Sequence, residues 1–184
     1  MKKFILIFLV LNCTLVKAQQ PLTPNEQLHK NAGDALLLAL PVLALSSTFI
    51  WKDGKKGTYQ FSKALAGTLT LSYGLKYVIN KERPNGENNY SFPSAHTSVT
   101  FASAAFLQKR YGWEYGIPAY AIAGYVGYTR IKSNKHDGWD VLAGAVIGTG
   151  MGYLFTKPFD KDKKLQISSG FIENTPTLGF TFTF

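Results

Sequence analysis

Apolar residues dominate long stretches of the chain and predict a helical body. Segments rich in Leu, Ala, Val and Gly alternate with short polar segments that contain Lys, Asn, Pro or Gly, which favour turns and helix ends. The last apolar segment contains the small residues Ala143, Gly144, Gly148, Gly150 and Gly152, at a spacing that lets a neighbouring helix approach closely. The expected helices cover residues 32–51, 58–80, 94–110, 113–131 and 138–156.

The N-terminal end departs from this pattern. Two lysines, Lys2 and Lys3, precede an apolar run, and Ala18 supplies a small residue for cleavage. Residues 1–18 are therefore expected to form a secretory signal peptide, with an uncleaved membrane anchor as the alternative. A polar leader over residues 19–31 is expected to follow.

The C-terminal end is expected to form strands. Phe and Thr alternate strictly over residues 180–184, and alternation with a period of two is typical of a strand. A turn is expected at residues 173–176, which contain Asn and Pro. Residues 158–184 are therefore interpreted as a C-terminal tail with a β-hairpin.

Charge and cysteine content narrow the class of protein. The formal net charge is +9, and it would become +6 after loss of the three lysines in residues 1–18. The only cysteine, Cys13, lies in the same segment, so the mature chain would have no disulfide and no cysteine metal site. A basic exported protein suits anionic substrates or lipid surfaces. Nucleic acid is not expected as a partner, because the basic residues are scattered.

The distribution of charge also favours a membrane location. Residues 32–51 and 113–131 are apolar over about 20 residues, the length that crosses a bilayer. Basic residues gather in the turns 52–56, 109–110 and 157–164, which would share one end of the bundle, as expected at a cytoplasmic face. The bundle is predicted to be embedded in or associated with a membrane, with its other end on the exported side. A soluble periplasmic bundle is the alternative.

Three polar clusters interrupt the apolar pattern and carry the candidate chemistry. Together they supply three cations, two imidazoles and one carboxylate, which could bind a phosphate and cut its ester bond through a histidine. The clusters are Lys76-x6-Arg83-Pro84, Pro93-Ser94-Ala95-His96 and Arg130-x5-His136-x3-Asp140.

The first two clusters would form an anion site. Lys76 and Arg83 are seven residues apart, so they would share one helix face if the helix continued that far. Ser94 begins the third expected helix, where free backbone N–H groups attract anions. His96 would lie beside the bound anion, where it could protonate a leaving oxygen.

The third cluster is the most specific. His136 and Asp140 are one helical turn apart, so the carboxylate could hold one imidazole nitrogen and leave the other free to attack. Arg130 supplies a planar guanidinium suited to phosphate oxygens. In an up-and-down bundle, the helix ends that carry the three clusters lie at the same end.

The order and spacing of the clusters resemble the type 2 phosphatidic acid phosphatase (PAP2) and vanadium haloperoxidase superfamily. The resemblance covers residues 76–140 by motif. The family usually has Gly where this chain has Ala95, and Ser where it has Thr129; the backbone N–H and the hydroxyl are kept. The resemblance implies an all-α, PAP2-like bundle of about five core helices, in a phosphatase domain over residues 32–157.

The resemblance also implies the roles of the site residues. His136 would attack phosphorus to form a phosphohistidine, Asp140 would orient it, and His96 would protonate the leaving group. No metal and no cofactor are implied, and His29, outside the motifs, is expected at the surface. The phosphate would be bound by Lys76, Arg83, Ser94, Ala95 and Arg130.

The expected function is a metal-independent phosphatase of the cell envelope that hydrolyses a lipid phosphomonoester or pyrophosphate. A vanadate-dependent haloperoxidase and a soluble periplasmic acid phosphatase are the alternatives, because the same cations would bind vanadate or a soluble ester. A non-enzymatic envelope protein would leave the three clusters unexplained. Neither the particular lipid nor the oligomeric state can be read from the sequence.

Overall fold

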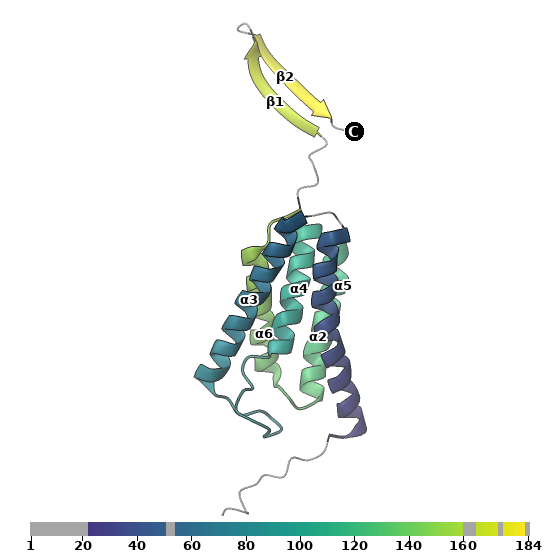
Figure 1. Cartoon of the computed structure of the whole chain (residues 1–184), viewed down its shortest axis with the longest axis vertical. Coiled ribbons are helices and arrows are strands. Elements are labelled where there is room, and N and C mark those ends of the chain that lie inside the picture. Colours follow the sequence, from purple (N-terminus) through teal and green to yellow (C-terminus); the bar gives the residue numbers. More distant parts are fainter. Residues whose placement is uncertain (1–21, 51–53, 160–164, 173–174, 183–184) are drawn as a thin grey trace, which may run out of the picture.

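The body of the protein is a bundle of helices (Figure 1). A computed structural model describes residues 22–50, 54–159, 165–172 and 175–182, so the expected signal peptide and Cys13 lie outside the described residues. The helices confirm the all-helical body, and they share the up-and-down arrangement expected from the sequence. They are α2 (Pro24–Ile50), α3 (Gly54–Ile79), α4 (Ala95–Tyr111), α5 (Trp113–Lys132) and α6 (Gly138–Phe155).

Helix α4 is the centre of the bundle and packs against the four other helices. Its side chains Phe106 and Leu107 form a buried core with Phe61 of α3 and Leu40 of α2. Several hydroxyl side chains of α4 are also fully buried: Thr97, Ser98, Thr100 and Ser103 have no exposed surface. The central position of α4 therefore depends on small and hydroxyl-bearing residues as much as on large apolar ones.

Helix α6 lies against α4 through a stripe of glycines. Gly144, Gly148 and Gly152 are buried. A Cβ atom on Gly148 would lie 2.1 Å from the carbonyl oxygen of Ser98, which is too close for any side chain. The glycine spacing seen in the sequence thus allows the two backbones to touch.

The first helix starts earlier than the sequence predicted. The polar leader expected over residues 19–31 is wrong for residues 24–31, which belong to α2. Thr23 and Glu26 form a reciprocal cap: the Thr23 N–H donates to Glu26 Oε2 (2.8 Å), and the Glu26 N–H donates to Thr23 Oγ1 (3.3 Å). Pro24, at the first helical position, loses no hydrogen bond there. Polar residues can therefore form this first part of α2.

Arg110 lies at the end of the bundle away from the polar clusters, and its charged side chain is buried. Arg110, which we expected in a basic turn at the cytoplasmic face, is 6% exposed. Its guanidinium donates to the carbonyl oxygen of Lys157 (2.7 Å) and to Oε1 of Gln60 (3.2 Å). Arg110 therefore ties the end of α4 to α3 and to the segment after α6.

Two strands follow the bundle along the chain. Strand β1 (Leu165–Ile172) pairs antiparallel with β2 (Thr175–Phe182), with Leu165 opposite Phe182 and Ile172 opposite Thr175. Residues 173–174, part of the expected turn, lie outside the described residues.

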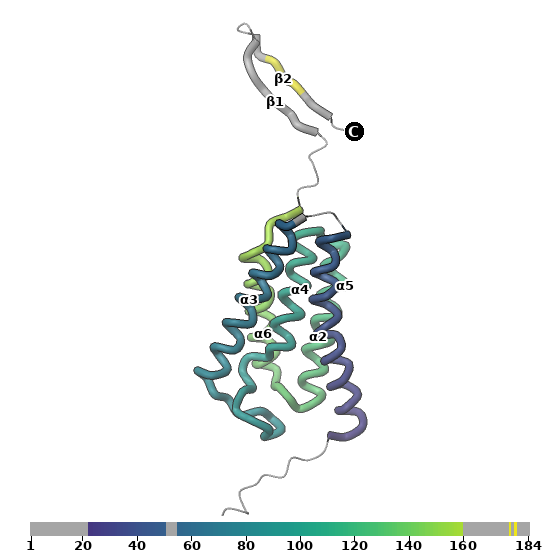
Figure 2. The backbone as a smooth tube through the Cα atoms, in the orientation of Figure 1, coloured from purple at the N-terminus to yellow at the C-terminus, as the bar shows by residue number. Residues whose placement is uncertain are grey.

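The segments that carry the three polar clusters lie at the end of the bundle opposite Arg110. Helices α3 and α5 end there, α4 and α6 begin there, and the N-terminal turns of α2 lie beside them (Figure 2). The loops that carry the three polar clusters are thereby brought together, although they are far apart in the sequence.

Candidate active site

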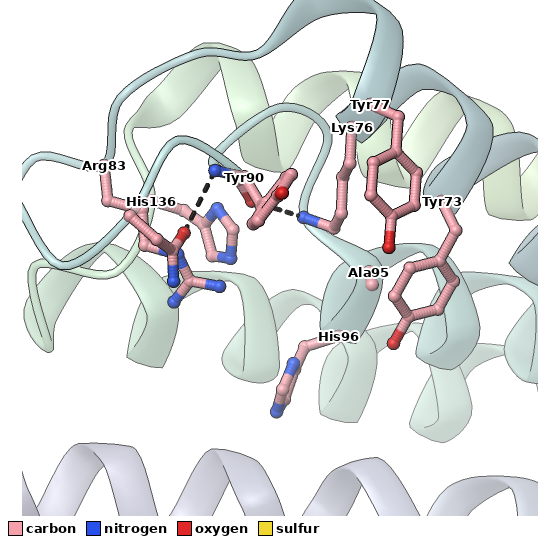
Figure 3. A pocket seen from close by; sticks show the side chains of 9 residues that line it. Tyr73, Lys76, Tyr77, Arg83, Tyr90, Ala95, His96 and His136 are labelled. Atoms are coloured by element: carbon pink, nitrogen blue, oxygen red, sulfur yellow. Dashed lines mark hydrogen bonds between the residues drawn. The ribbon is translucent and has the colours of Figure 1, made fainter.

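A pocket of about 230 Å³ opens at this end of the bundle (Figure 3). All three sequence-predicted clusters contribute to its wall, together with three tyrosines and Asn88. The lining residues are Tyr73, Lys76, Tyr77, Arg83, Asn88, Tyr90, Ala95, His96 and His136. Ser94, Arg130 and Asp140 do not line the pocket but contact residues around it.

Lys76 and Arg83 reach the pocket from different elements, a helix and the loop that follows it. Helix α3 stops at Ile79, and Asn80 takes the left-handed conformation (φ 50°) that Asn tolerates at a helix end. The expectation that the helix continues to Arg83 is therefore wrong, and Arg83 reaches the site from the following loop. Lys76, still in α3, donates to the carbonyl oxygens of Tyr90 and Pro93 at 2.7 Å each, and so ties this loop to the helix.

Glu87 ties the loop that carries Arg83 to the neighbouring loop between α5 and α6. Glu87 lies 3.5 Å from the Arg83 guanidinium and also forms an ion pair with Lys135, next to His136. The hydrogen bond from Lys135 lowers the pKa of Glu87, so this carboxylate stays ionised. Nε of Arg83 is buried without a hydrogen-bond partner among the described residues. A buried donor of this kind is ready for an acceptor on a ligand.

Ser94 determines where α4 begins. Its side chain caps the helix by accepting from the backbone N–H of Thr97 (3.5 Å), and its own N–H donates to the carbonyl oxygen of Asp140 (2.9 Å). The N-cap role predicted for Ser94 is confirmed, and it also joins the starts of α4 and α6. Ala95 and His96, the first residues of α4, are thereby placed on the pocket wall.

His136 and Asp140 face one another at the start of α6. Nδ1 of His136 lies 3.6 Å from Oδ2 of Asp140, and both side chains are buried. Burial lowers the pKa of His136 below its ordinary value of 6.5; nearby Lys76 and Arg83 lower it further, against the opposing effect of Asp140. His136 is therefore neutral at pH 7, the state in which an imidazole can act as a nucleophile.

Asp140 is surrounded by donors that the sequence analysis did not identify. Ser91 Oγ donates to it at 2.5 Å and Lys81 Nζ at 2.7 Å. Asp137 caps α6 in a reciprocal box: its side chain accepts from the Asp140 N–H, and its own N–H donates to the Asp140 carboxylate. An acidic residue three positions before Asp140 is a readable capping signal. Nothing in the sequence pairs Asp140 with Ser91 or Lys81.

Arg130 lies behind the pocket and binds α2. Its NH1 group donates to Oδ1 of Asp34 (2.9 Å), and NH2 donates to the carbonyl oxygen of Lys30 (2.7 Å). The same Asp34 oxygen lies 2.9 Å from Nε2 of His96. Asp34 thus joins two sequence-predicted site residues from different helices, and the sequence analysis gave it no role.

Other titratable groups do not form a metal site. Within the described ranges, no three His, Cys, Asp or Glu side chains are grouped so that they could hold a metal ion. His29, expected at the surface, is half-buried with its ring edge-on to Tyr128, at a centroid distance of 5.6 Å. His29 does not line the pocket, and its contact with Tyr128 gives it a packing role.

Known proteins are similar to this chain in sequence and in fold. The profile of the PAP2 superfamily matches residues 48–164. A lipid A 4'-phosphatase of Helicobacter pylori is 26% identical over 166 residues, which cover 83% of both chains. A lipid A 1-phosphatase of Porphyromonas gingivalis is 39% identical over 83 residues, 43% of this chain but only 18% of that protein. In fold, the bundle is similar to a transmembrane PAP2-type phosphatidylglycerolphosphate phosphatase from Bacillus subtilis, with a TM-score of 0.59, 22% identity, and coverage of 83% of this chain and 92% of that one.

Proposed function

This chain belongs to the PAP2 superfamily, and from that premise we propose that it is a phosphatase of the cell envelope that hydrolyses a lipid phosphomonoester or pyrophosphate. The observation that carries this proposal is the pocket itself. It gathers the cations Lys76 and Arg83 with the imidazoles His96 and His136 in about 230 Å³. Cations that bind phosphate oxygens, beside a neutral imidazole, are the equipment for phosphoryl transfer to histidine.

The first chemical step is attack by His136. With Nδ1 facing Asp140, Nε2 is the nitrogen available to phosphorus. An N–P bond forms while the P–O bond to the leaving group breaks, and His96 gives its proton to the departing oxygen. Positive charge that develops on the His136 ring is balanced by the Asp140 carboxylate.

The second step regenerates the enzyme. Neutral His96 takes a proton from water, and the resulting hydroxide attacks the phosphohistidine. Inorganic phosphate leaves, and His136 returns to its neutral form. Through both steps, Lys76, Arg83 and Arg130 balance the charge on the phosphoryl oxygens. The Ser94 hydroxyl and the Ala95 N–H, where α4 begins, bind the same group. The chain's own cations thus supply the charge stabilisation that a metal supplies elsewhere.

The distribution of side chains supports a membrane location. Helix α2 is the one described helix that is long and apolar enough to cross a bilayer. Large apolar residues face outward on α6, where Leu142, Val146 and Leu154 are 53–69% exposed, whereas hydroxyl-bearing residues fill the interior around α4. Apolar residues outside and small polar residues between helices are typical of membrane bundles. We therefore propose that the bundle is embedded in a membrane.

Exposed tryptophans near the two ends of the bundle fit this location. Trp113 begins α5 at the end away from the pocket, and Trp139 lies at the start of α6 at the pocket end; they are 59% and 73% exposed. Tryptophan is enriched at both membrane–water interfaces. With residues 1–18 as the export signal, the pocket would face the exported side, where lipid head groups are within reach.

The substrate is proposed as a phosphate group on a lipid. Two of the relatives reported above are lipid A phosphatases, and the fold relative acts on phosphatidylglycerolphosphate. These lipids share a phosphomonoester at a membrane surface, and the pocket cations recognise that group rather than the rest of the lipid.

The test is a panel of lipid phosphates with purified protein and the His136→Ala variant. The panel holds lipid A, phosphatidic acid, phosphatidylglycerol phosphate and undecaprenyl pyrophosphate, and released phosphate is measured. We expect hydrolysis of at least one lipid, an acid-labile phosphoprotein in rapidly quenched wild type, and neither in His136→Ala, whose rate should fall by several orders of magnitude. His29→Ala serves as the matched control and should retain activity. Residual activity above about a tenth of wild type in His136→Ala would overturn the nucleophile assignment.

A further inference from the structure

Asp34 of α2 lies between two groups of the proposed site without belonging to any motif. One carboxylate oxygen, Oδ1, accepts from NH1 of Arg130 at 2.9 Å and lies 2.9 Å from Nε2 of His96. In Figure 3, His96 points away from the other pocket side chains toward a neighbouring helix. The carboxylate that it meets is 62 residues earlier in the chain, so the contact depends on how α2 packs.

The turn of α2 around Asp34 lets the Arg130 guanidinium approach the helix backbone closely. The neighbouring Gly33 is buried, and a Cβ atom there would lie 2.1 Å from NH2 of Arg130. The carbonyl oxygen of Lys30, one turn earlier, accepts from the same NH2 at 2.7 Å. A close approach permitted by glycine, together with a second acceptor, fixes the Arg130 guanidinium against this turn. Arg130 is 3% exposed, so little water competes for it.

We propose that Asp34 is a positioning residue of the phosphatase reaction, which orients His96 and favours its protonated form as the proton donor to the leaving oxygen. The proposal rests on the phosphatase function proposed above. A carboxylate beside an imidazole favours the protonated ring and fixes its orientation. The same oxygen also binds Arg130, so it holds the proton donor and a phosphate-binding cation at a constant separation.

The charges around His96 make such a partner necessary. Arg130 from α5 shares the Asp34 oxygen with it, and the pocket wall adds His136, Lys76 and Arg83. All of these are cations or become cations during the reaction, and each disfavours a proton on His96. Asp34 is the acidic residue that faces it from α2. In the bond-breaking step the proton moves from His96 to the leaving oxygen, while Asp34 stays ionised and changes no bond.

The experiment compares two leaving groups. An alkoxide is a poor leaving group and needs a proton, whereas p-nitrophenolate leaves without one, so loss of proton donation affects octyl phosphate much more than p-nitrophenyl phosphate. We expect Asp34→Asn to lower kcat/KM for octyl phosphate by roughly ten- to a hundredfold, and for p-nitrophenyl phosphate by no more than about threefold. Asp34→Glu, which keeps the charge, should recover part of the loss.

Controls separate this role from other roles of the same residue. Glu114→Gln makes the same chemical change at an exposed position in the first turn of α5 and should leave both rates unchanged. Thermal unfolding in detergent checks that Asp34→Asn is folded. An equal loss for both esters would show a structural role only, and a gain in activity would show that Asp34 blocks the phosphate site; either result overturns the proposal. A wild-type protein that hydrolyses neither these esters nor the lipid panel would instead overturn the proposed function.

Discussion

Nζ of Lys81 lies 2.7 Å from Oδ1 of Asp140, the buried carboxylate that faces His136. Lys81 comes from the loop after α3 and Asp140 from the first turn of α6, so this ion pair joins the first and third polar clusters. Burial opposes the charge on Lys81, but its hydrogen bonds to Asp137 and Asp140 outweigh burial and raise its pKa. With this charged partner, Asp140 stays ionised and does not take a proton from His136.

Loss of the Lys81 charge should weaken the site and the fold together. In Lys81→Met, Asp140 keeps Ser91 and one backbone N–H but loses its charged partner. We expect the free energy of unfolding to fall by about 1–3 kcal/mol. We also expect kcat to fall with little change in KM, because Lys81 does not line the pocket. Lys56→Met, at an exposed lysine of α3, is the control for denaturant unfolding and kinetics. Unchanged kcat in Lys81→Met would show that the ion pair has no part in the reaction.

The His136 imidazole should titrate below its ordinary range. Its pKa is lowered by burial and by the neighbouring cations, so the ring stays neutral as the pH falls and gains a proton only below 6.5. NMR titration of labelled histidines should give a midpoint below 6.5 for the signal that is lost in His136→Gln. A midpoint above 6.5 would mean that Asp140 outweighs burial and that a large share of the nucleophile is protonated near neutral pH.

The glycine contact between α4 and α6 should tolerate no side chain. In Gly148→Ala, the new methyl group would meet the Ser98 carbonyl at 2.1 Å, so the helices must move apart. We expect a loss of about 1–3 kcal/mol in unfolding free energy. Gly150→Ala, in the same helix with no atom within 4 Å of the new Cβ, should be neutral or stabilising by up to about 1 kcal/mol. Equal stabilities of the two variants would contradict the close packing.

Activity should survive removal of metal ions. The proposed mechanism uses Lys76, Arg83 and Arg130 for the charge stabilisation that divalent ions supply in other phosphatases. We expect full activity in excess EDTA, and inhibition by vanadate, which can adopt the five-coordinate geometry of phosphorus under attack by His136. A metal-dependent phosphatase in the same buffer verifies chelation. Complete inhibition by EDTA that Mg²⁺ or Zn²⁺ reverses would refute this mechanism.

The pocket should be accessible from the exported side of the membrane. Asn89 lies in the exposed loop beside the pocket, and Lys55 lies at the start of α3, at the other end of the bundle. In a Cys13→Ser background, Asn89→Cys should react with an impermeant thiol reagent in intact spheroplasts, and Lys55→Cys should react only after lysis. The reverse labelling pattern would invert the topology. Reaction of both before lysis would favour a soluble periplasmic bundle.

The sequence alone determined the helical body and five residues of the pocket wall, because the signals for both are local. Those five are Lys76, Arg83, Ala95, His96 and His136. Apolar periodicity marks a helix within a few turns, and the Ser94 cap acts within one turn. The glycine spacing of α6 likewise indicated a close helix contact. The same local reasoning failed where polar residues form helix, as in residues 24–31, and where α3 stops before Arg83.

Only the tertiary structure decided which charges meet. Asp34 and Arg130 are 96 residues apart, and Lys81 and Asp140 are 59 apart. Arg110, predicted from the sequence as part of a basic turn, is buried against Gln60 and the carbonyl of Lys157. The sequence does not indicate which residue a charged side chain will pair with. The partner depends on how the helices pack, because an ion pair forms only when packing brings two groups within a few ångströms and excludes the water that would otherwise solvate them.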